Sequence, residues 1–216
     1  MLEQPTFPTL VKKFLYQQLY PDSELSFLEA LEASCLEIDG KIRIFNSAIA
    51  TFCAPSDTSG IYGMRREHIR ATPSWQGGPA RYDCILINSD PNVDGALGFE
   101  VARTFLFFSF QHQSKTYPCA YVQWYSYMGE EPDEDTGFWI VEPDADDDGS
   151  PHLGIVHVDA IYRAVHLMPV YSTPEFIDRA VTMHSSLDKF QRFYVNKFID
   201  HHSFATLSGH ASSLVE

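Results

Sequence analysis

Apolar residues near the N-terminus recur at the three- and four-residue spacing of an amphipathic helix. Leucines and phenylalanines between residues 10 and 19 follow this spacing, and Pro21 ends the run. A second set between residues 25 and 36 repeats the spacing, and Gly40 follows it. The pattern therefore predicts a helical hairpin over residues 1–40.

Between residues 41 and 172 the apolar period shortens toward two, which is typical of β-strands. The strongest pattern predicts strands at Glu100–His112 and Tyr117–Tyr127, joined by a hairpin turn at Gln111–Lys115. Shorter strands are expected at Ile42–Ile44, Phe45–Phe52, Cys84–Asn88, Gly137–Glu142, Gly154–Val158 and Val165–Val170. Because closure removes exposed strand edges, these strands predict a β-rich core domain over 41–172 that forms a small antiparallel β-barrel or curled sheet.

After Pro174 the apolar spacing turns helical again. One short helix is expected around residues 176–180, and another carries Leu187, Phe190 and Phe193. We expect both helices to pack on the core within 173–207, followed by a frayed tail over 208–216. The predicted fold class is therefore α+β, with helices flanking the barrel or curled sheet at both ends of the chain.

Acidic residues dominate the charge, but they are concentrated in one part of the chain. The 216 residues are 44% hydrophobic and carry a formal net charge of −14. Residues 130–148 hold ten acids and no base, whereas residues 41–81 have a net charge of +4. The total charge argues against a protein that binds polyanions over its whole surface, because phosphate neutralisation supplies much of nucleic-acid affinity.

Several protein classes lack their sequence signals here. No apolar run approaches 18 residues, and the N-terminus lacks the basic and apolar regions of a signal peptide, so we expect an intracellular protein, compatible with the nucleus. The four cysteines are widely spaced and are expected to be reduced core residues. His166, between apolar neighbours, is expected to be a hydrogen-bonded core residue. No P-loop, GxGxxG, GxSxG or HExxH motif occurs, so we expect no cofactor and no enzymatic activity.

The segment that begins at Asp144 matches the first half of a calcium-binding EF-hand loop, with Asp144, Asp146 and Asp148 at its ligand positions. The loop needs a carboxylate at its twelfth position, where this chain has Ile155, and its flanks are predicted strands rather than helices. An acidic hairpin turn is therefore the preferred interpretation. A weak cation site is the alternative, and with it a metal-dependent hydrolase or nuclease.

Arginines cluster with an aromatic residue in the basic segment of the chain. They are Arg65, Arg66, Arg70 and Arg81, and Trp75 lies between the last two. Arginine beside aromatic rings suits a phosphate backbone or a single nucleic-acid strand. The alternative is that these arginines pair with the acidic 130–148 segment or with core carboxylates, and the overall charge favours this alternative.

Several motifs resemble the C-terminal region of transposon proteins from basidiomycete fungi, of the Plavaka group and the related KDZ-type elements. The motifs are Met64–Trp75, Gly78–Asp83, Tyr117–Tyr125, Pro132–Trp139, Val158–Pro169 and Phe193–His202. The resemblance implies a transposase tail that lacks the nuclease domain. That domain is RNase H-like and holds three carboxylates on a parallel sheet, for which no βαβ pattern occurs here. No catalytic residue is therefore carried over.

Taken with the resemblance, these patterns predict a non-enzymatic accessory or interaction domain. Its partner is expected to be a protein or a chromatin component. Nucleic acid is a further possible partner, which the net charge does not favour. No membrane partner is expected. If nucleic acid is the partner, the arginine and tryptophan set described above is the predicted contact surface. A folded relic without a selected function is a further alternative, and the oligomeric state stays open.

Overall fold

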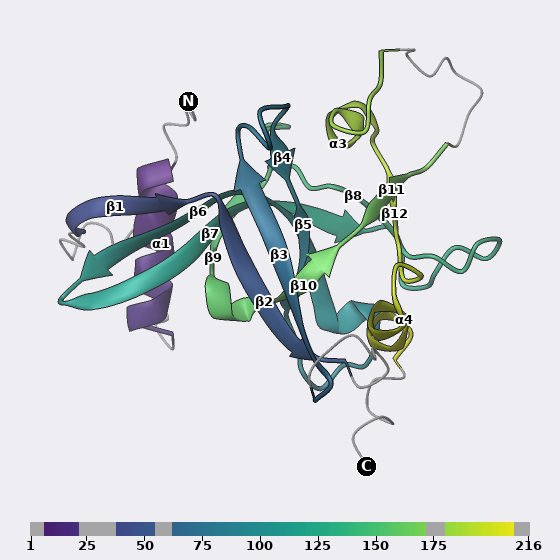
Figure 1. Cartoon of the computed structure of the whole chain (residues 1–216), viewed down its shortest axis with the longest axis horizontal. Coiled ribbons are helices and arrows are strands. Elements are labelled where there is room, and N and C mark those ends of the chain that lie inside the picture. Colours follow the sequence, from purple (N-terminus) through teal and green to yellow (C-terminus); the bar gives the residue numbers. More distant parts are fainter. Residues whose placement is uncertain (1–6, 22–37, 55–61, 172–179, 210–216) are drawn as a thin grey trace.

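Helices lie near both ends of the part of the chain that is described. The structure is a computed structural model, and it describes residues 7–21, 38–54, 62–171 and 180–209. Its α-helices are α1 (Phe7–Leu19), α3 (Ser186–Lys189) and α4 (His201–Leu207), and its 3-10 turns are η1 (Ala96–Gly98) and η2 (Val158–Ala160). Figure 1 shows α1 on one side of the molecule and α3 and α4 on the other.

Antiparallel strands make up most of the fold. In chain order they are β1 (Asp39–Phe45), β2 (Ser47–Cys53), β3 (Met64–Thr72), β4 (Arg81–Tyr82), β5 (Cys84–Asn88), β6 (Phe99–His112), β7 (Lys115–Tyr127), β8 (Ile140–Pro143), β9 (Leu153–His157), β10 (Ile161–Val165), β11 (Leu167–Pro169) and β12 (Phe193–Val195). The main sheet runs β10-β5-β6-β7-β8-β12-β11, with β1 also paired to β6 and β9 to β7. A second sheet has the order β2-β3-β4.

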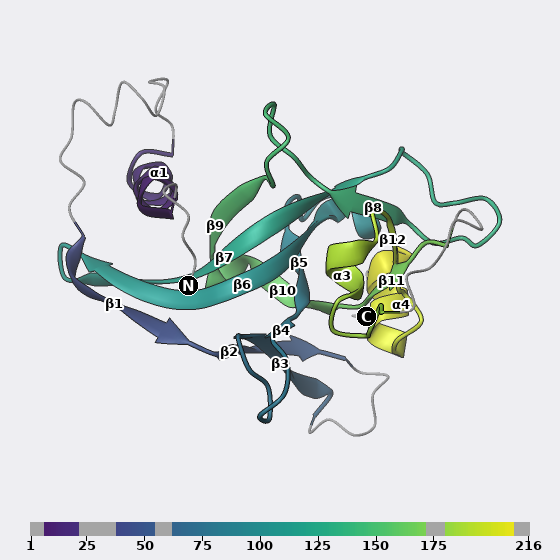
Figure 2. The ribbon, with the colours of Figure 1, turned by 90° about the horizontal axis from the view of Figure 1, so that it is seen from above.

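The two sheets together form a nearly closed, barrel-like unit. Strand β1 leads directly into β2 through Asn46, so one continuous segment joins the main sheet to the second sheet. The pairing of β6 with β7 shifts register between Thr104 and Leu106, an irregularity of the kind that increases the bend of a strand. Figure 2 shows the curved β6–β7 hairpin between α1 on one side and β2–β3 on the other.

Three apolar clusters fill the spaces between these layers. The first lies between the β2–β3 layer and the main sheet and includes Phe52, Ile69 and Phe107. The second lies under α1, where Leu15 packs with rings of β6 and β7. The third joins the C-terminal segments to the main sheet and includes Phe193, which is fully buried. The main sheet is therefore covered on both faces.

The expected α+β class and the closed or curled antiparallel sheet are confirmed. The long hairpin occurs where alternation and turn residues predict it, with β6 and β7 joined at Gln113 and Ser114. Both residues have positive φ, at 49° and 65°, which suits a tight hairpin turn. The strand over Cys84–Asn88 has the predicted bounds, and α1 lies within the first predicted helix region.

The sequence pattern does not predict β3, β4 or β12, and β10 overlaps a predicted strand only at Val165. Strand β3 covers Met64–Thr72, a segment whose charged residues hide its alternation. Strand β12 falls inside the segment expected to be a helix carrying Phe193. Because β12 pairs with both β8 and β11, the C-terminal segment contributes to the sheet rather than packing on it only through helices.

Some predicted features differ in burial or lie outside the described residues. His166 is exposed rather than a core residue, and its Nδ1 lies 3.2 Å from the side-chain nitrogen of Asn196. Cys84 and Cys119 are buried free thiols, as expected, whereas Cys53 is exposed. The predicted second helix of the hairpin, most of the helix around 176–180 and residues 210–216 of the tail lie outside the described residues.

Candidate functional site

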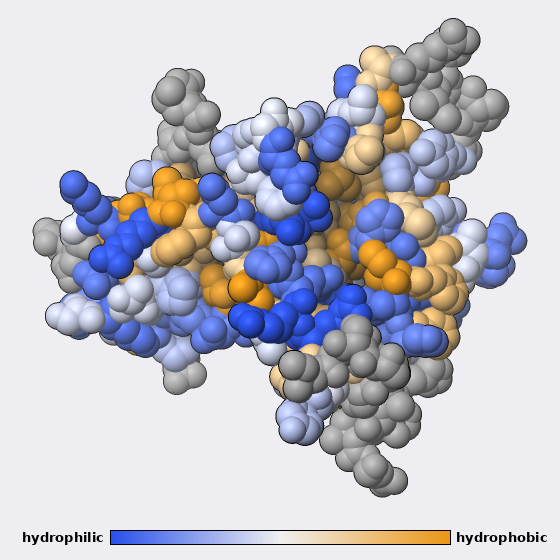
Figure 3. Space-filling model, in the orientation of Figure 1, coloured by the Kyte–Doolittle hydropathy of each residue, from blue (hydrophilic) through white to orange (hydrophobic). Residues whose placement is uncertain are grey.

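The outer face of the β2–β3–β4 sheet carries the basic residues that the sequence singles out. Residues on β3 alternate in burial, so Arg66, His68 and Arg70 point away from the core while Ile69 points into it. Within the described part of the chain, the side chain of Arg66 makes no ion pair or hydrogen bond. Figure 3 shows that this face is strongly hydrophilic over β3 and β4.

Trp75 connects two of these arginines at one end of the face. The guanidinium of Arg70 lies 4.1 Å from the centre of the Trp75 ring, and that of Arg81 lies 5.7 Å from it. The Nε of Arg81 donates to the carboxylate of Asp83 at 2.8 Å. Asp83 also accepts a hydrogen bond from the backbone N–H of Arg70. The loop between β3 and β4 is closed by a hydrogen bond from the N–H of Trp75 to the carbonyl of Pro79. The structure therefore brings Arg70, Trp75 and Arg81 together.

Arg65 does not belong to the same face. Its position on β3 alternates with Arg66 and places it with Glu67 on the inward side of the strand. The positive charge of Arg65 contributes to a lower pKa at both Asp200 and His202, so it lies near them. Of the five predicted contact residues, Arg65 is therefore the one that the structure separates from the others.

A buried polar cluster surrounds Arg163, which is 1% exposed. Its Nη1 and Nη2 donate to the two carboxylate oxygens of Asp200 at 3.0 and 2.7 Å, and its Nε donates to the carbonyl of Ala164. Glu67 Oε1 lies 3.6 Å from Nη2, and Glu67 Oε2 accepts the N–H of Ala164. The guanidinium lies 4.8 Å from the ring centre of Phe52. Most donors of this buried cation therefore have partners.

His202 completes this cluster and has a defined tautomer when neutral. Arg163 can only donate, so the 3.0 Å contact between its Nη1 and His202 Nδ1 makes that nitrogen an acceptor. The Nε2–H of His202 then donates to the Tyr162 hydroxyl at 3.1 Å. Burial and then the charge of Arg163 lower the pKa of His202. Burial alone would raise the pKa of Asp200, but hydrogen bonds from Arg163 and Ser203 outweigh it and lower this pKa to about 2.

The cluster fixes α4 against the barrel. Asp200 is the N-cap of α4, because its side chain accepts the N–H of Ser203, and it binds Arg163 of β10 at the same time. Because the same carboxylate caps α4 and binds Arg163, we assign these groups a structural role. Sequence reasoning missed the cluster, although an arginine within the apolar segment Ile161–Val165 was a signal that a buried partner is needed.

The three aspartates of the EF-hand-like segment are not brought together. Asp144 contacts Nδ1 of His152 at 2.9 Å, and Asp148 accepts the N–H of Ser150. These hydrogen bonds shape the hairpin between β8 and β9, as the acidic-turn interpretation expects. In the described residues, no group of three or more His, Cys, Asp or Glu side chains is placed to hold a metal ion.

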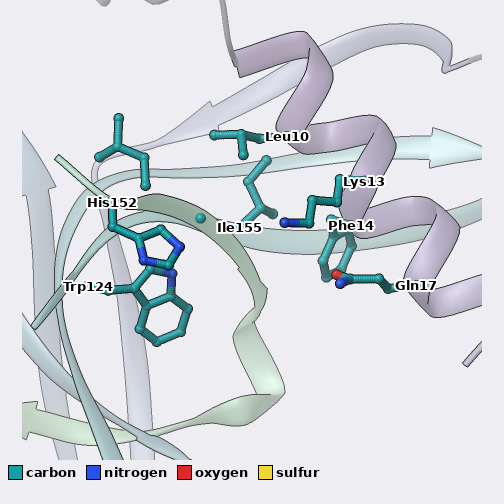
Figure 4. A pocket seen from close by; sticks show the side chains of 9 residues that line it. Leu10, Lys13, Phe14, Gln17, Trp124, His152 and Ile155 are labelled. Carbon is teal, nitrogen blue, oxygen red and sulfur yellow. The ribbon is translucent and has the colours of Figure 1, made fainter. Parts of the chain in front are cut away.

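A shallow pocket of about 180 Å³ lies between α1 and β9. Figure 4 shows Lys13 and Gln17 extending from α1 toward the indole of Trp124 and the imidazole of His152. A side chain at Gly154 would overlap the Trp124 indole nitrogen, so glycine lets this ring lie against β9. The lining residues of the pocket include no serine, threonine or cysteine that could act as a nucleophile.

Comparison with protein-family models, curated proteins and solved structures gives no match for this chain. In the described segments, no helix has both the length and the apolar character needed to cross a bilayer. The functional argument therefore depends on the side chains and their geometry.

Proposed function

We propose that this chain is a non-enzymatic accessory domain that binds single-stranded nucleic acid on the outer face of its β2–β3–β4 sheet. The origin from a transposon protein, suggested by the sequence motifs, is part of the same proposal. The observation that carries it is the arrangement of Arg66, Arg70 and Arg81 on one face, with two of the three guanidinium groups beside Trp75.

The chemistry of this face suits a phosphate backbone. Arginine presents several donors in a planar fork, and base or guanidinium stacking on an aromatic ring is tolerant of sequence. His68 lies between Arg66 and Arg70, and Ser47 and Thr51 pair with those arginines on β2. Between Arg66 and Arg70 the face thus offers cations together with small hydroxyl donors along about 13 Å of strand, at ~3.3 Å per residue.

The acidic residues of 130–148 lie away from this face, where Asp83 is the carboxylate that contacts Arg81. The hairpin between β8 and β9, which carries Asp146–Asp148, extends from the side of the molecule opposite β2 and β3 in Figure 2. The β7–β8 loop, which holds most of the other acids of 130–148, lies at the far edge. The net charge of −14 therefore does not describe the local charge near Arg66.

The test is binding of a fluorescent single-stranded oligonucleotide over a series of salt concentrations. We expect binding at low salt that weakens with added salt, and loss of about 2 from the logarithmic salt slope in the variant Arg66→Ala/Arg70→Ala/Arg81→Ala, at ~0.7 per phosphate contact. The matched control removes three exposed cations elsewhere, in Lys12→Ala/Lys115→Ala/Lys189→Ala. Absence of binding at low salt, or equal losses in both variants, would refute the proposal.

A further inference from the structure

Large apolar side chains are exposed where the chain enters α4. Phe198 is 60% exposed and Ile199 is 52% exposed. Figure 3 shows an apolar area over α4 and β12 that borders the hydrophilic tip of the β7–β8 loop. Contiguous exposed apolar area marks interaction surfaces, whereas singly scattered apolar residues do not.

Contacts within the chain hold this apolar area against the β7–β8 loop. The rings of Phe138 and Phe198 are 5.4 Å apart at 90°, an edge-to-face arrangement. The ammonium of Lys197 donates to the carbonyl of Gly137 at 2.7 Å. On the other side, the cap that Asp200 makes on α4 fixes the same segment to Arg163. The apolar area and the loop therefore form one fixed surface.

The loop supplies negative charge to that surface. Glu130, Glu131, Glu134 and Asp135 are exposed, and none of them makes an ion pair with the residues that the structure describes. Asp133 instead shapes the loop, because its carboxylate accepts hydrogen bonds from the N–H and the hydroxyl of Thr136. We call Glu130, Glu131, Glu134, Asp135, Phe198 and Ile199 the acidic–aromatic surface.

We propose that the acidic–aromatic surface binds a cationic segment of another protein, rich in lysine or arginine and carrying an apolar residue that packs on Phe198 and Ile199. Charge complementarity selects this partner, since unpaired carboxylates favour bound cations and repel phosphates. Lys197 provides an example within the chain, because its ammonium lies 5.4 Å from the ring centre of Phe198. This site is separate from the proposed nucleic-acid face and does not depend on it.

The apolar component distinguishes this surface from a merely acidic loop. Charges on the edge of an interface chiefly steer the encounter, whereas a desolvated aromatic contact contributes much of the affinity. A partner that uses both should lose affinity when either component is removed. A partner that responds only to net charge should lose the same affinity whether acids are removed from the β7–β8 loop or from the β8–β9 hairpin.

The test uses a fluorescent lysine- and arginine-rich peptide with one central leucine, and a second peptide in which serine replaces that leucine. Anisotropy gives the affinity of each peptide for the wild type and for the variants Phe198→Ser, Ile199→Ser and Glu130→Gln/Glu131→Gln. The matched control is Asp146→Asn/Asp147→Asn, which removes the same charge from the β8–β9 hairpin. Thermal melting confirms that each variant is folded, and Ile199→Ser serves if Phe198→Ser does not fold.

We expect the leucine peptide to bind with about tenfold lower affinity to the loop and apolar variants, and unchanged affinity to the hairpin variant. The serine peptide should bind the wild type at least about tenfold more weakly than the leucine peptide. Equal losses in both charge variants would show nonspecific attraction and overturn the proposal. Absence of binding, indifference to the leucine, or self-association of the chain that buries Phe198 would overturn it as well.

Discussion

A buried arginine must have partners for its donors, and Arg163 obtains them from residues distant in the chain. Asp200 and His202 lie 37 and 39 positions away, and Glu67 approaches from β3. Losing one partner of a buried charge leaves the other uncompensated, which costs about 3–5 kcal/mol. Asp200 holds its charge in the folded state because hydrogen bonds from Arg163 and Ser203 offset its burial. The cluster therefore makes stability depend on pH.

We predict that acid weakens the fold in two steps. His202 has a lowered pKa in the folded state, so its contribution to stability is present above the ordinary value of 6.5 and is lost as pH falls below it. Protonation would place an N–H of His202 against Arg163, which can only donate. The charge of Asp200 contributes about 2 kcal/mol to the stability of the fold, and this contribution is lost as pH falls from about 4 toward 2. Urea unfolding at several pH values measures both steps.

The variant His202→Gln should remove the first step, because the glutamine oxygen can still accept from Arg163 but does not titrate. His166→Gln is the matched control, since His166 is exposed and its ring hydrogen-bonds only with Asn196 among the described side chains. If stability still falls below pH 6.5 in His202→Gln, the first step belongs to another group.

At the residue scale, the sequence locates functional candidates better than it locates their partners. The proximity of Arg70, Trp75 and Arg81 follows from their closeness in the chain. The separation of Arg65 follows only from the alternation of β3, which its charged positions hide. Arg163 was not predicted to be buried, because its carboxylate partner comes from a segment that no local pattern links to it.

At the element scale, local signals succeed where both strands of a hairpin are long. The β6–β7 pair has alternation and a tight turn within one continuous segment, so its register can be predicted. Strand β12 has only three residues, and Leu187, Phe190 and Phe193 mimic a helical spacing before it. Its strand conformation depends on pairing with β8 and β11, which are distant in sequence.

Helix α1 offers a prediction at the same scale, because it covers the face of the hairpin that holds Cys119. Burial raises the pKa of this thiol to about 12, and the side chain is fully buried. The variant Leu15→Ala removes a fully buried side chain of α1 and should cost about 2–5 kcal/mol. Opening of α1 should then speed alkylation of Cys119, while Cys84, in the third apolar cluster, stays protected.

Mass spectrometry after a pulse of thiol reagent measures the two rates, with exposed Cys53 as the internal standard for reagent activity. Equal acceleration at Cys84 and Cys119 would mean that the whole barrel opens together, contrary to this expectation.

For the whole molecule, charge is divided among surfaces that face different ways. Arg66, Arg70 and Arg81 lie on the outer face of the β2–β3–β4 sheet. The acidic–aromatic surface lies at the edge formed by the β7–β8 loop and the start of α4. The fold thus presents surfaces of opposite charge on one compact unit. If both proposals hold, separate partners bind these surfaces at the same time.

The buried core continues past the β-rich segment of the chain. The sequence pattern places the end of the β-rich core at residue 172, but β12 lies beyond it, and Phe193 and Val195 are 0% and 1% exposed. A fragment of residues 1–172 lacks β12 and the Asp200 partner of Arg163. It also lacks the C-terminal residues that pack in the third apolar cluster. We therefore expect this fragment to lose cooperative unfolding, as measured by near-ultraviolet circular dichroism and urea titration.

Adding a peptide of residues 180–209 should restore part of that signal, because it supplies both β12 and α4. In the full chain, Phe193→Ala is the milder test of the same contact and should lower stability by about 3–5 kcal/mol without abolishing the transition. A fragment 1–172 that unfolds as cooperatively as the full chain would place the folding unit within the β-rich segment alone. Under that outcome, β12 and α4 would be additions to a barrel that is already complete.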